Sequence, residues 1–220
     1  ERAVDRLRKV HTVVYEPSLV DDGPGLLSKA AQTDALVVRN RTQVRGPLLE
    51  ALGRCRVVAR LGVGLDNIDV AACEARGLAV IPATGANALS VAEYVIATAM
   101  LLLRGAYAST SEVAAGHWPR PALSQGREVA GKTLGLVGCG HIGQLTARLA
   151  QAIGMHVIAC DPLTAVDGTS LGPSGVKRVD LDTLVCDADV ISLHVPLLDS
   201  TRGLFGVQRL GQMKPGAVLI

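Results

Sequence analysis

The feature that most constrains the fold is the alternation of short β-branched runs with helical patterns along the 220 residues. Such alternation predicts parallel strands joined by right-handed crossovers, the architecture of α/β proteins. The runs predicted to be strands are His11–Tyr15, Ala35–Arg39, Arg56–Leu61 and Leu78–Ile81, then Thr133–Val137, His156–Cys160, Val190–Val195 and Ala217–Ile220. The helical patterns are Glu1–Lys9, Gly25–Ala31, Pro47–Leu52, Val70–Arg76 (ended by Gly77), Leu89–Arg104 and Ile142–Ala152.

Composition narrows the class of protein further. Apolar residues make up 49% of the chain, which excludes a disordered protein, and a net charge of +2 does not favour nucleic acid or a membrane surface as a partner. The five cysteines form no C-x-x-C pair, so neither a zinc site nor a disulfide framework is indicated. Without a leader pattern or a membrane-length apolar run, we expect a protein of the reducing cytoplasm.

The two series of elements divide near residue 88. The predicted helix Leu89–Arg104 has Ser90 and Glu93 at capping-box spacing and is apolar on nearly every face. We therefore expect it to be buried, either in a core or against another subunit. The polar stretch 105–131, which holds Trp118, looks like a long excursion rather than a domain linker.

A glycine motif begins the second series. The sequence Gly138-Cys139-Gly140-His141-Ile142-Gly143 is a GxGxxG that follows one predicted strand and opens a helix, and a second strand ends at Asp161. In this context Gly138 permits a tight turn, Gly140 lets the backbone approach a diphosphate, and Gly143 lets helix and strand touch. Asp161 would bind the ribose hydroxyls and repel a 2′-phosphate, which favours NAD over NADP. The alternative is a strand–helix turn that binds nothing.

Two further positions are candidates with ordinary alternatives. Arg60 precedes Gly62-Val63-Gly64, where backbone N–H groups and a guanidinium suit an anion, although a simple turn with a solvated arginine has the same pattern. His194 ends a strand at the ligand edge of the sheet, or is a histidine of the pocket wall. None of the five histidines has an evident carboxylate partner by spacing.

Taken together and in order, these motifs resemble the D-isomer-specific 2-hydroxyacid dehydrogenases, especially the phosphoglycerate dehydrogenase-like branch. Besides those above, the resemblance rests on Ala35–Arg39, Leu61–Asp69, Asn87 with Ser90–Glu93, Gly131–Gly135, Asp161-Pro162, His194–Leu197, Thr201 and Met213–Ala217. It implies a flavodoxin-like substrate domain over residues 1–87 and a Rossmann NAD-binding domain over residues 88–220. Each would be incomplete, the first without its opening strand and C-terminal return, the second truncated at its C-terminal end.

The resemblance also implies roles for single residues. Val63 and Gly64 would bind the substrate carboxylate through backbone N–H groups, with Arg60 near the other end of the substrate. The cofactor NAD would contact Val91, Gly138, Gly140, His141, Ile142, Gly143, Asp161, His194, Val195, Pro196 and Thr201. A homodimer would form through the helix 89–104 and the excursion 105–130.

The function implied is hydride transfer between nicotinamide and a small D-2-hydroxy acid, such as a phosphoglycerate-, sulfolactate- or hydroxypyruvate-like compound. The family's catalytic Arg, Glu and His would lie beyond Ile220, so no residue of this chain is assigned as the acid, and we expect these 220 residues alone to be inactive. The alternative is a non-catalytic NAD(H)-binding sensor or interaction module on the same scaffold.

Overall fold

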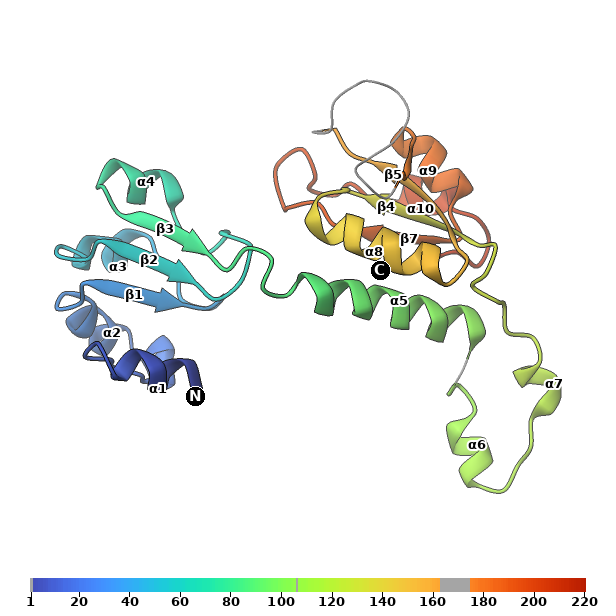
Figure 1. Ribbon diagram of the computed structural model, residues 1–220, viewed down its shortest axis with the longest axis horizontal. Helices are drawn as coiled ribbons and strands as arrows, with labels where there is room; N and C mark the ends of the chain where they lie inside the picture. The colour runs from blue at the N-terminus through green and yellow to red at the C-terminus, as the bar shows by residue number, and fades with distance from the viewer. Residues whose placement is uncertain (1, 106, 163–174) are drawn as a thin grey trace. The chain divides into compact units, whose positions relative to one another are not determined.

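The computed structural model describes residues 2–105, 107–162 and 175–220, in two compact units, Glu1–Thr84 and Gly85–Ile220 (Figure 1). Glu1, the first residue of the predicted helix Glu1–Lys9, and position 106 of the excursion lie outside the described residues. Each unit contains an all-parallel sheet with helical crossovers, which confirms the predicted α/β class.

Unit 1 is built on a three-stranded parallel sheet in the order β1-β2-β3. Register pairs Val38 of β1 with Arg60 of β2, and Arg60 with Pro82 of β3, so the carboxyl ends of the strands are aligned. The elements are α1 (Arg2–Arg8), the 3-10 helix η1 (Pro17–Asp21), α2 (Gly23–Ala30), β1 (Ala35–Val38), α3 (Gly46–Ala51), β2 (Val57–Arg60), α4 (Val70–Ala75) and β3 (Ala79–Pro82).

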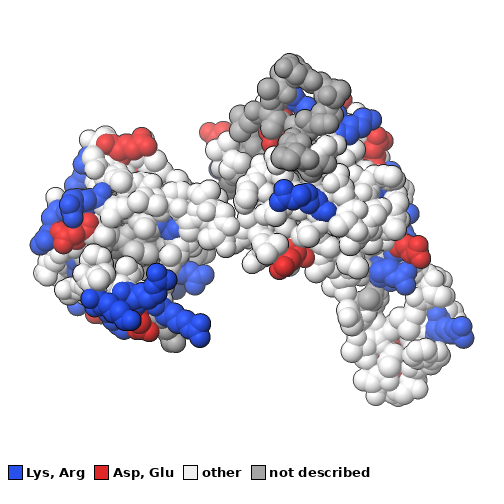
Figure 2. All heavy atoms as spheres, viewed as in Figure 1, with Lys and Arg blue, Asp and Glu red and all other residues white. Residues whose placement is uncertain are grey.

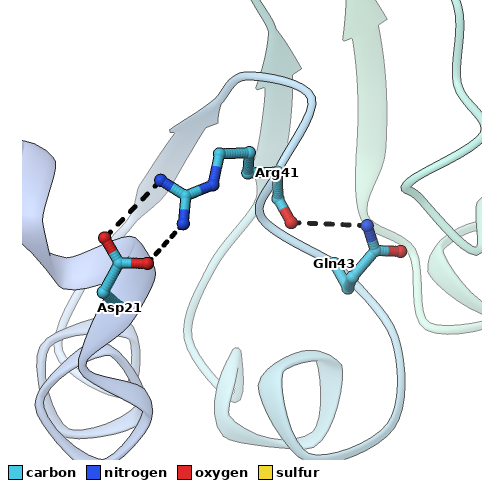
Figure 3. Close-up of polar contacts among 3 residues, drawn as sticks. All are labelled: Asp21, Arg41 and Gln43. Carbon is cyan, nitrogen blue, oxygen red and sulfur yellow. Dashed lines mark hydrogen bonds and ion pairs between the residues drawn. The ribbon is translucent and has the colours of Figure 1, made fainter.

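Local chemistry sets the ends of these elements. The Asp69 side chain accepts a hydrogen bond from the Ala72 N–H (3.0 Å) and begins α4, and Gly77, at φ +70°, ends it as predicted. An ion pair joins Asp21 of η1 to Arg41, whose carbonyl accepts a hydrogen bond from the Gln43 amide at 3.3 Å (Figure 3). These polar contacts attach the segment before α2 to the loop after β1.

The strand predicted at His11–Tyr15 is wrong. This segment is irregular, and Val14 and Tyr15 are more than half exposed. A β-branched run becomes a strand only when a neighbouring strand takes its backbone hydrogen bonds, and none of the described strands lies beside it.

Unit 2 contains a five-stranded parallel sheet in the order β6-β5-β4-β7-β8. Its strands are β4 (Thr133–Val137), β5 (His156–Cys160), β6 (Lys177–Arg178), β7 (Val190–Leu193) and β8 (Val218–Leu219). Its helices are α5 (Ala88–Arg104), α6 (Thr110–Ala114), α7 (Arg120–Leu123), α8 (His141–Ala152), α9 (Leu181–Asp187) and α10 (Val207–Gln212). The glycine motif thus lies between β4 and α8, as the sequence predicts.

Both faces of this sheet are buried. Leu134, Leu136 and Ala159 lie in a cluster with α5 and α8, while Val137 and Ile191 lie in a second cluster with α9. Alternate residues of one strand therefore enter different cores, which is why these strands are apolar at almost every position.

The helix α5 differs from the prediction in where it begins and in how much of its surface is buried. It begins at Ala88 after Asn87, so Ser90 lies inside the helix and forms no capping box with Glu93. A stripe of small and branched residues, including Ala92, Ala99 and Leu103, is buried, whereas Leu89, Tyr94 and Leu102 are more than half exposed. Among the described residues, therefore, only part of the apolar surface of this helix is buried.

The excursion contains the short helices α6 and α7, which the sequence pattern did not predict. In it, His117 Nδ1 lies 2.9 Å from Glu112 Oε2, a carboxylate partner that the spacing of the two residues in the sequence does not make evident. Both side chains are exposed. On the face shown in Figure 2, basic side chains are interspersed with acidic ones in each unit. Among the described helices, none has the length and hydropathy needed to cross a membrane.

Candidate cofactor-binding site

Three strands of unit 2 end beside one another and place the candidate residues at one edge of the sheet. Gly138 follows β4, Asp161 follows β5 and His194 follows β7. Their backbones are joined directly, because the Gly138 N–H donates to the Cys160 carbonyl (2.9 Å) and the His194 N–H donates to the Val137 carbonyl (2.8 Å). Ligands of open parallel sheets bind at this carboxyl edge.

The glycines of the motif have different surroundings. Gly138 has φ +95°, a backbone conformation that side chains disfavour, and a Cβ there would lie 3.0 Å from the His194 carbonyl. A Cβ at Gly143 would lie 2.6 Å from the Gly138 carbonyl oxygen, so α8 and β4 touch at this point. At Gly140 a Cβ would meet no atom of the described residues within 4 Å. The open space lies beside the first turn of α8, whose N–H groups have no intrahelical acceptors and favour an anion.

Asp161 is attached to the same turn. The residue is 8% exposed, and its Oδ2 accepts a hydrogen bond from the Cys139 N–H at 2.7 Å. The carboxylate predicted for the ribose is therefore held beside the backbone predicted for the diphosphate. Burial and the nearby Asp161 charge raise the pKa of the Cys139 thiol to about 11.

A pocket of about 670 Å³ opens next to Asp161. Its other lining residues are Cys160, Pro162, Arg178, Val179, Asp180, Leu181 and Thr183. Sequence reasoning missed this wall, because β6 has only two residues, Lys177 and Arg178, and neither is apolar. The pairing of β6 with β5 brings Arg178 and the residues after it beside Asp161.

The loop after β7 holds the other predicted residues of the pocket. His194 and Val195 are partly buried, and Pro196 is exposed. Thr201 uses its hydroxyl within the loop, donating to the Pro196 carbonyl (2.6 Å) and accepting from the Leu198 N–H (2.8 Å). The Thr201 side chain thus shapes the segment in which Pro196 lies.

The remaining cofactor candidates lie on two helices of unit 2. His141 and Ile142 are the first two residues of α8, and the His141 ring lies 3.9 Å from the position of a Cβ on Gly85. Val91 lies in the first turn of α5 and is partly buried.

The substrate candidates are in unit 1, at the carboxyl end of β2. The N–H groups of Val63 and Gly64 donate to no other described residue. Arg60 Nε is buried and has no hydrogen-bond partner in the described part of the chain, and its guanidinium packs on Gly62, where a Cβ would collide with Nη1. A buried donor without an acceptor is costly, so this position is suited to an anionic ligand.

A parallel sheet in this order, with a GxGxxG turn after its central strand and an acidic residue after the next, defines a dinucleotide-binding protein of the Rossmann type. Residues 96–220 match the family model described as D-isomer specific 2-hydroxyacid dehydrogenase, NAD binding domain. The chain belongs to the D-isomer-specific 2-hydroxyacid dehydrogenase family, and NAD, the predicted cofactor, is confirmed by this domain.

Individual relatives agree with this assignment. The chain is 50% identical to the (S)-sulfolactate dehydrogenase of Chromohalobacter salexigens over all of its own length and 71% of that protein. It is 42% identical to the hydroxypyruvate reductase of Thermotoga maritima and 40% identical to the D-3-phosphoglycerate dehydrogenase of Mycobacterium leprae. These matches cover 89% and 90% of the chain but only 62% and 38% of the two relatives.

A solved structure also matches the chain along its whole length. The NAD-dependent formate dehydrogenase of Staphylococcus aureus in complex with NAD has a TM-score of 0.83 and 26% identity, over 100% of this chain and 66% of that one.

Proposed function

We propose that the protein is an NAD-dependent oxidoreductase that transfers a hydride between nicotinamide and a small D-2-hydroxy acid or its 2-oxo acid. The observation that carries the proposal is the hydrogen bond between Asp161 and the glycine turn. It holds a carboxylate that can accept hydrogen bonds from a ribose next to backbone N–H groups that can bind a diphosphate, at one edge of the sheet. Bound NAD would supply or accept the hydride. The turn and the start of α8 would hold the diphosphate, and His194, Val195, Pro196 and Thr201 would frame the pocket.

In this proposal residues 1–87 form the substrate domain and residues 88–220 the NAD-binding domain. Val63 and Gly64 would donate N–H groups to the substrate carboxylate, and Arg60 would pair with an anionic group at the far end. The identity to a sulfolactate dehydrogenase favours a sulfolactate-like substrate over a phosphoglycerate- or hydroxypyruvate-like one.

We also propose a homodimer in a reducing compartment such as the cytoplasm. Tyr94 and Leu102 of α5, and Tyr107 and Trp118 of the excursion, are exposed apolar side chains of the kind that mark an interface. All five cysteines are unpaired. Sedimentation of the 220-residue chain tests the dimer: Leu102→Glu should shift the protein to monomer, and Leu210→Glu, at an equally exposed leucine of α10, should not.

Cofactor binding is tested by titrating the chain with NADH and following nucleotide fluorescence. Asp161→Asn keeps an oxygen that can accept the Cys139 N–H but removes the charge, so we expect NADH affinity to fall at least tenfold because charge-assisted hydrogen bonds to the ribose are lost. NADPH should bind the wild-type chain more weakly than NADH. Equal NADH affinity in the variant would contradict the assigned role of Asp161.

The substrate is tested with a panel of 2-oxo acids and NADH, on this chain and on any longer form of the protein that contains it. Arg60→Ala should raise the KM for sulfopyruvate or phosphohydroxypyruvate far more than for pyruvate. Arg54→Ala, which removes a surface partner of Asp34, is the matched control and should leave KM unchanged. NADH binding without turnover of any 2-oxo acid by the longest form would contradict the enzyme.

A further inference from the structure

The hydroxyl of Ser192 lies 3.0 Å from Nε2 of His194, at the edge of the sheet that the proposed function assigns to NAD. The two residues are separated by one position at the end of β7, so their side chains leave the same face of the strand. Ser192 is 1% exposed and His194 is partly buried. The His194 backbone is fixed against Gly138, the first glycine of the turn.

The burial of Ser192 decides which group donates. Its hydroxyl makes no other hydrogen bond among the described residues. If the hydroxyl accepted from an Nε2–H, its own hydrogen would have no acceptor in a buried place, which is costly. The hydroxyl therefore donates to Nε2, and a neutral imidazole with an unprotonated Nε2 carries its hydrogen on Nδ1.

The charge of the ring is consistent with this arrangement. Burial lowers the pKa of His194 below its ordinary value of 6.5, so the ring is predominantly neutral at pH 7. Nδ1 has no hydrogen-bond partner among the described residues. It is also not fully buried, so it can reach solvent or a ligand. An N–H donor is thus left available beside the glycine turn.

We propose that Ser192 is a positioning residue that holds His194 as the neutral Nδ1–H tautomer, so that the ring donates one hydrogen bond to an oxygen of the bound dinucleotide. This inference rests on the proposed function for the identity of the ligand, but not for the tautomer. The hydroxyl also fixes the plane of the ring, since rotation would break the contact to Nε2.

The tautomer is measured by two-bond ¹H–¹⁵N correlation of the imidazole nitrogens in the ¹⁵N-labelled 220-residue chain without nucleotide at pH 7.5, with His194→Gln used to assign the signal. We expect the Nδ1–H pattern in the wild type, a shift towards Nε2–H in Ser192→Ala, and retention of Nδ1–H in Ser192→Thr. Affinity for NADH should fall about threefold to tenfold in Ser192→Ala, the value of one neutral hydrogen bond, and stay near wild type in Ser192→Thr.

The wild-type spectrum decides the matter even if Ser192→Ala does not fold. An Nε2–H ring in a chain that binds NADH would overturn the role of Ser192 and leave the proposed function standing. An Nδ1–H ring in a chain that binds no NADH would overturn the proposed function. An Nδ1–H pattern and an affinity that are both unchanged in a folded Ser192→Ala would also overturn the role of Ser192.

Discussion

At the scale of single residues, the site is held together by backbone as much as by side chains. Gly138 accommodates the His194 carbonyl, Gly143 accommodates the Gly138 carbonyl, and the Cys139 N–H reaches Asp161. A side chain at either close contact would collide with a main-chain atom that cannot rotate away. A Cβ on Gly140, in contrast, would meet no atom within 4 Å among the residues that the structure describes.

The contrast between two of these glycines leads to a prediction. Gly143→Ala puts a Cβ 2.6 Å from the Gly138 carbonyl oxygen and should lower the free energy of unfolding by about 1–3 kcal/mol, the usual cost of overpacking. Gly140→Ala should leave the unfolding free energy nearly unchanged yet abolish NADH binding, because the methyl group fills the space proposed for the diphosphate. Urea denaturation and NADH titration measure the two effects. A Gly140→Ala variant that binds NADH normally would contradict the placement of the diphosphate.

Cysteine reactivity provides a second prediction at this scale. A pKa of about 11 leaves Cys139 almost entirely as the unreactive thiol at pH 8, and its side chain is fully buried. Cys186 on α9 is exposed. Iodoacetamide at pH 8 followed by peptide mass spectrometry should therefore label Cys186 long before Cys139 in the folded chain. Labelling of both at the same rate in urea is the control, and early labelling of Cys139 in the native chain would be inconsistent with its burial.

At the scale of elements, strands that form the site could be predicted from sequence almost to the residue. Thr133–Val137 and His156–Cys160 agree with β4 and β5, because an apolar run closed by glycine or Asp-Pro leaves little freedom in where a buried strand ends. Elements defined by partners could not be predicted. The run His11–Tyr15 has the composition of a strand but no described strand beside it. The strand β6 has only two residues and forms because Ile158 and Ala159 lie beside it.

The residues of the candidate site also divide into those that the local sequence marks and those that depend on neighbours in the fold. The position of Asp161 beside the glycine turn could be predicted, because its spacing from the glycines is set by the length of one helix and one strand. The pocket wall around Arg178 and the hydroxyl of Ser192 could not be, since their roles depend on which side chains the sheet brings together.

At the scale of elements, the close packing of β4 against α9 can be tested by substitution. A Cβ on Gly135 would lie 2.7 Å from Leu184 Cδ2 and 3.0 Å from Ala188 Cβ. Gly135→Ala should therefore destabilise unit 2 by about 1–3 kcal/mol in urea denaturation. Gly211→Ala is the matched control, because that glycine lies in α10 and no described residue lies within 4 Å of the position of its Cβ. Alanine there should stabilise by about 0.5–1 kcal/mol. Equal stability of the two variants would refute the tight strand–helix packing.

At the scale of the whole molecule, the two units contribute different chemistry. Unit 2 has an acidic residue attached to a glycine turn, and unit 1 has an arginine whose Nε is buried without a partner among residues 2–105, 107–162 and 175–220. A negative group suits the hydroxyls of a ribose, and a positive group suits a carboxylate or sulfonate. This division of charge supports the assignment of cofactor to one unit and substrate to the other.

The stability of the molecule should depend on pH through His194. Burial lowers its pKa in the folded chain below the ordinary value of 6.5, so on acidification the unfolded chain binds a proton before the folded chain does. The unfolding free energy therefore falls as the pH decreases through 6.5 towards the folded pKa, by about 1.4 kcal/mol for each unit between the two values.

Urea denaturation of the wild type and His194→Gln at pH 7.5 and 5.5 isolates this contribution from other titrating groups. We expect the wild type to lose more stability than the variant between the two pH values. The effect is separate from that of Asp180, whose pKa is lowered by the Thr183 N–H and whose stabilisation of α9 is lost only as the pH falls below about 3.8. Equal losses of unfolding free energy in the two proteins would mean that the His194 ring is solvated. Binding of the dinucleotide to the neutral ring should enlarge the difference between the two losses when NADH is present in saturating amount.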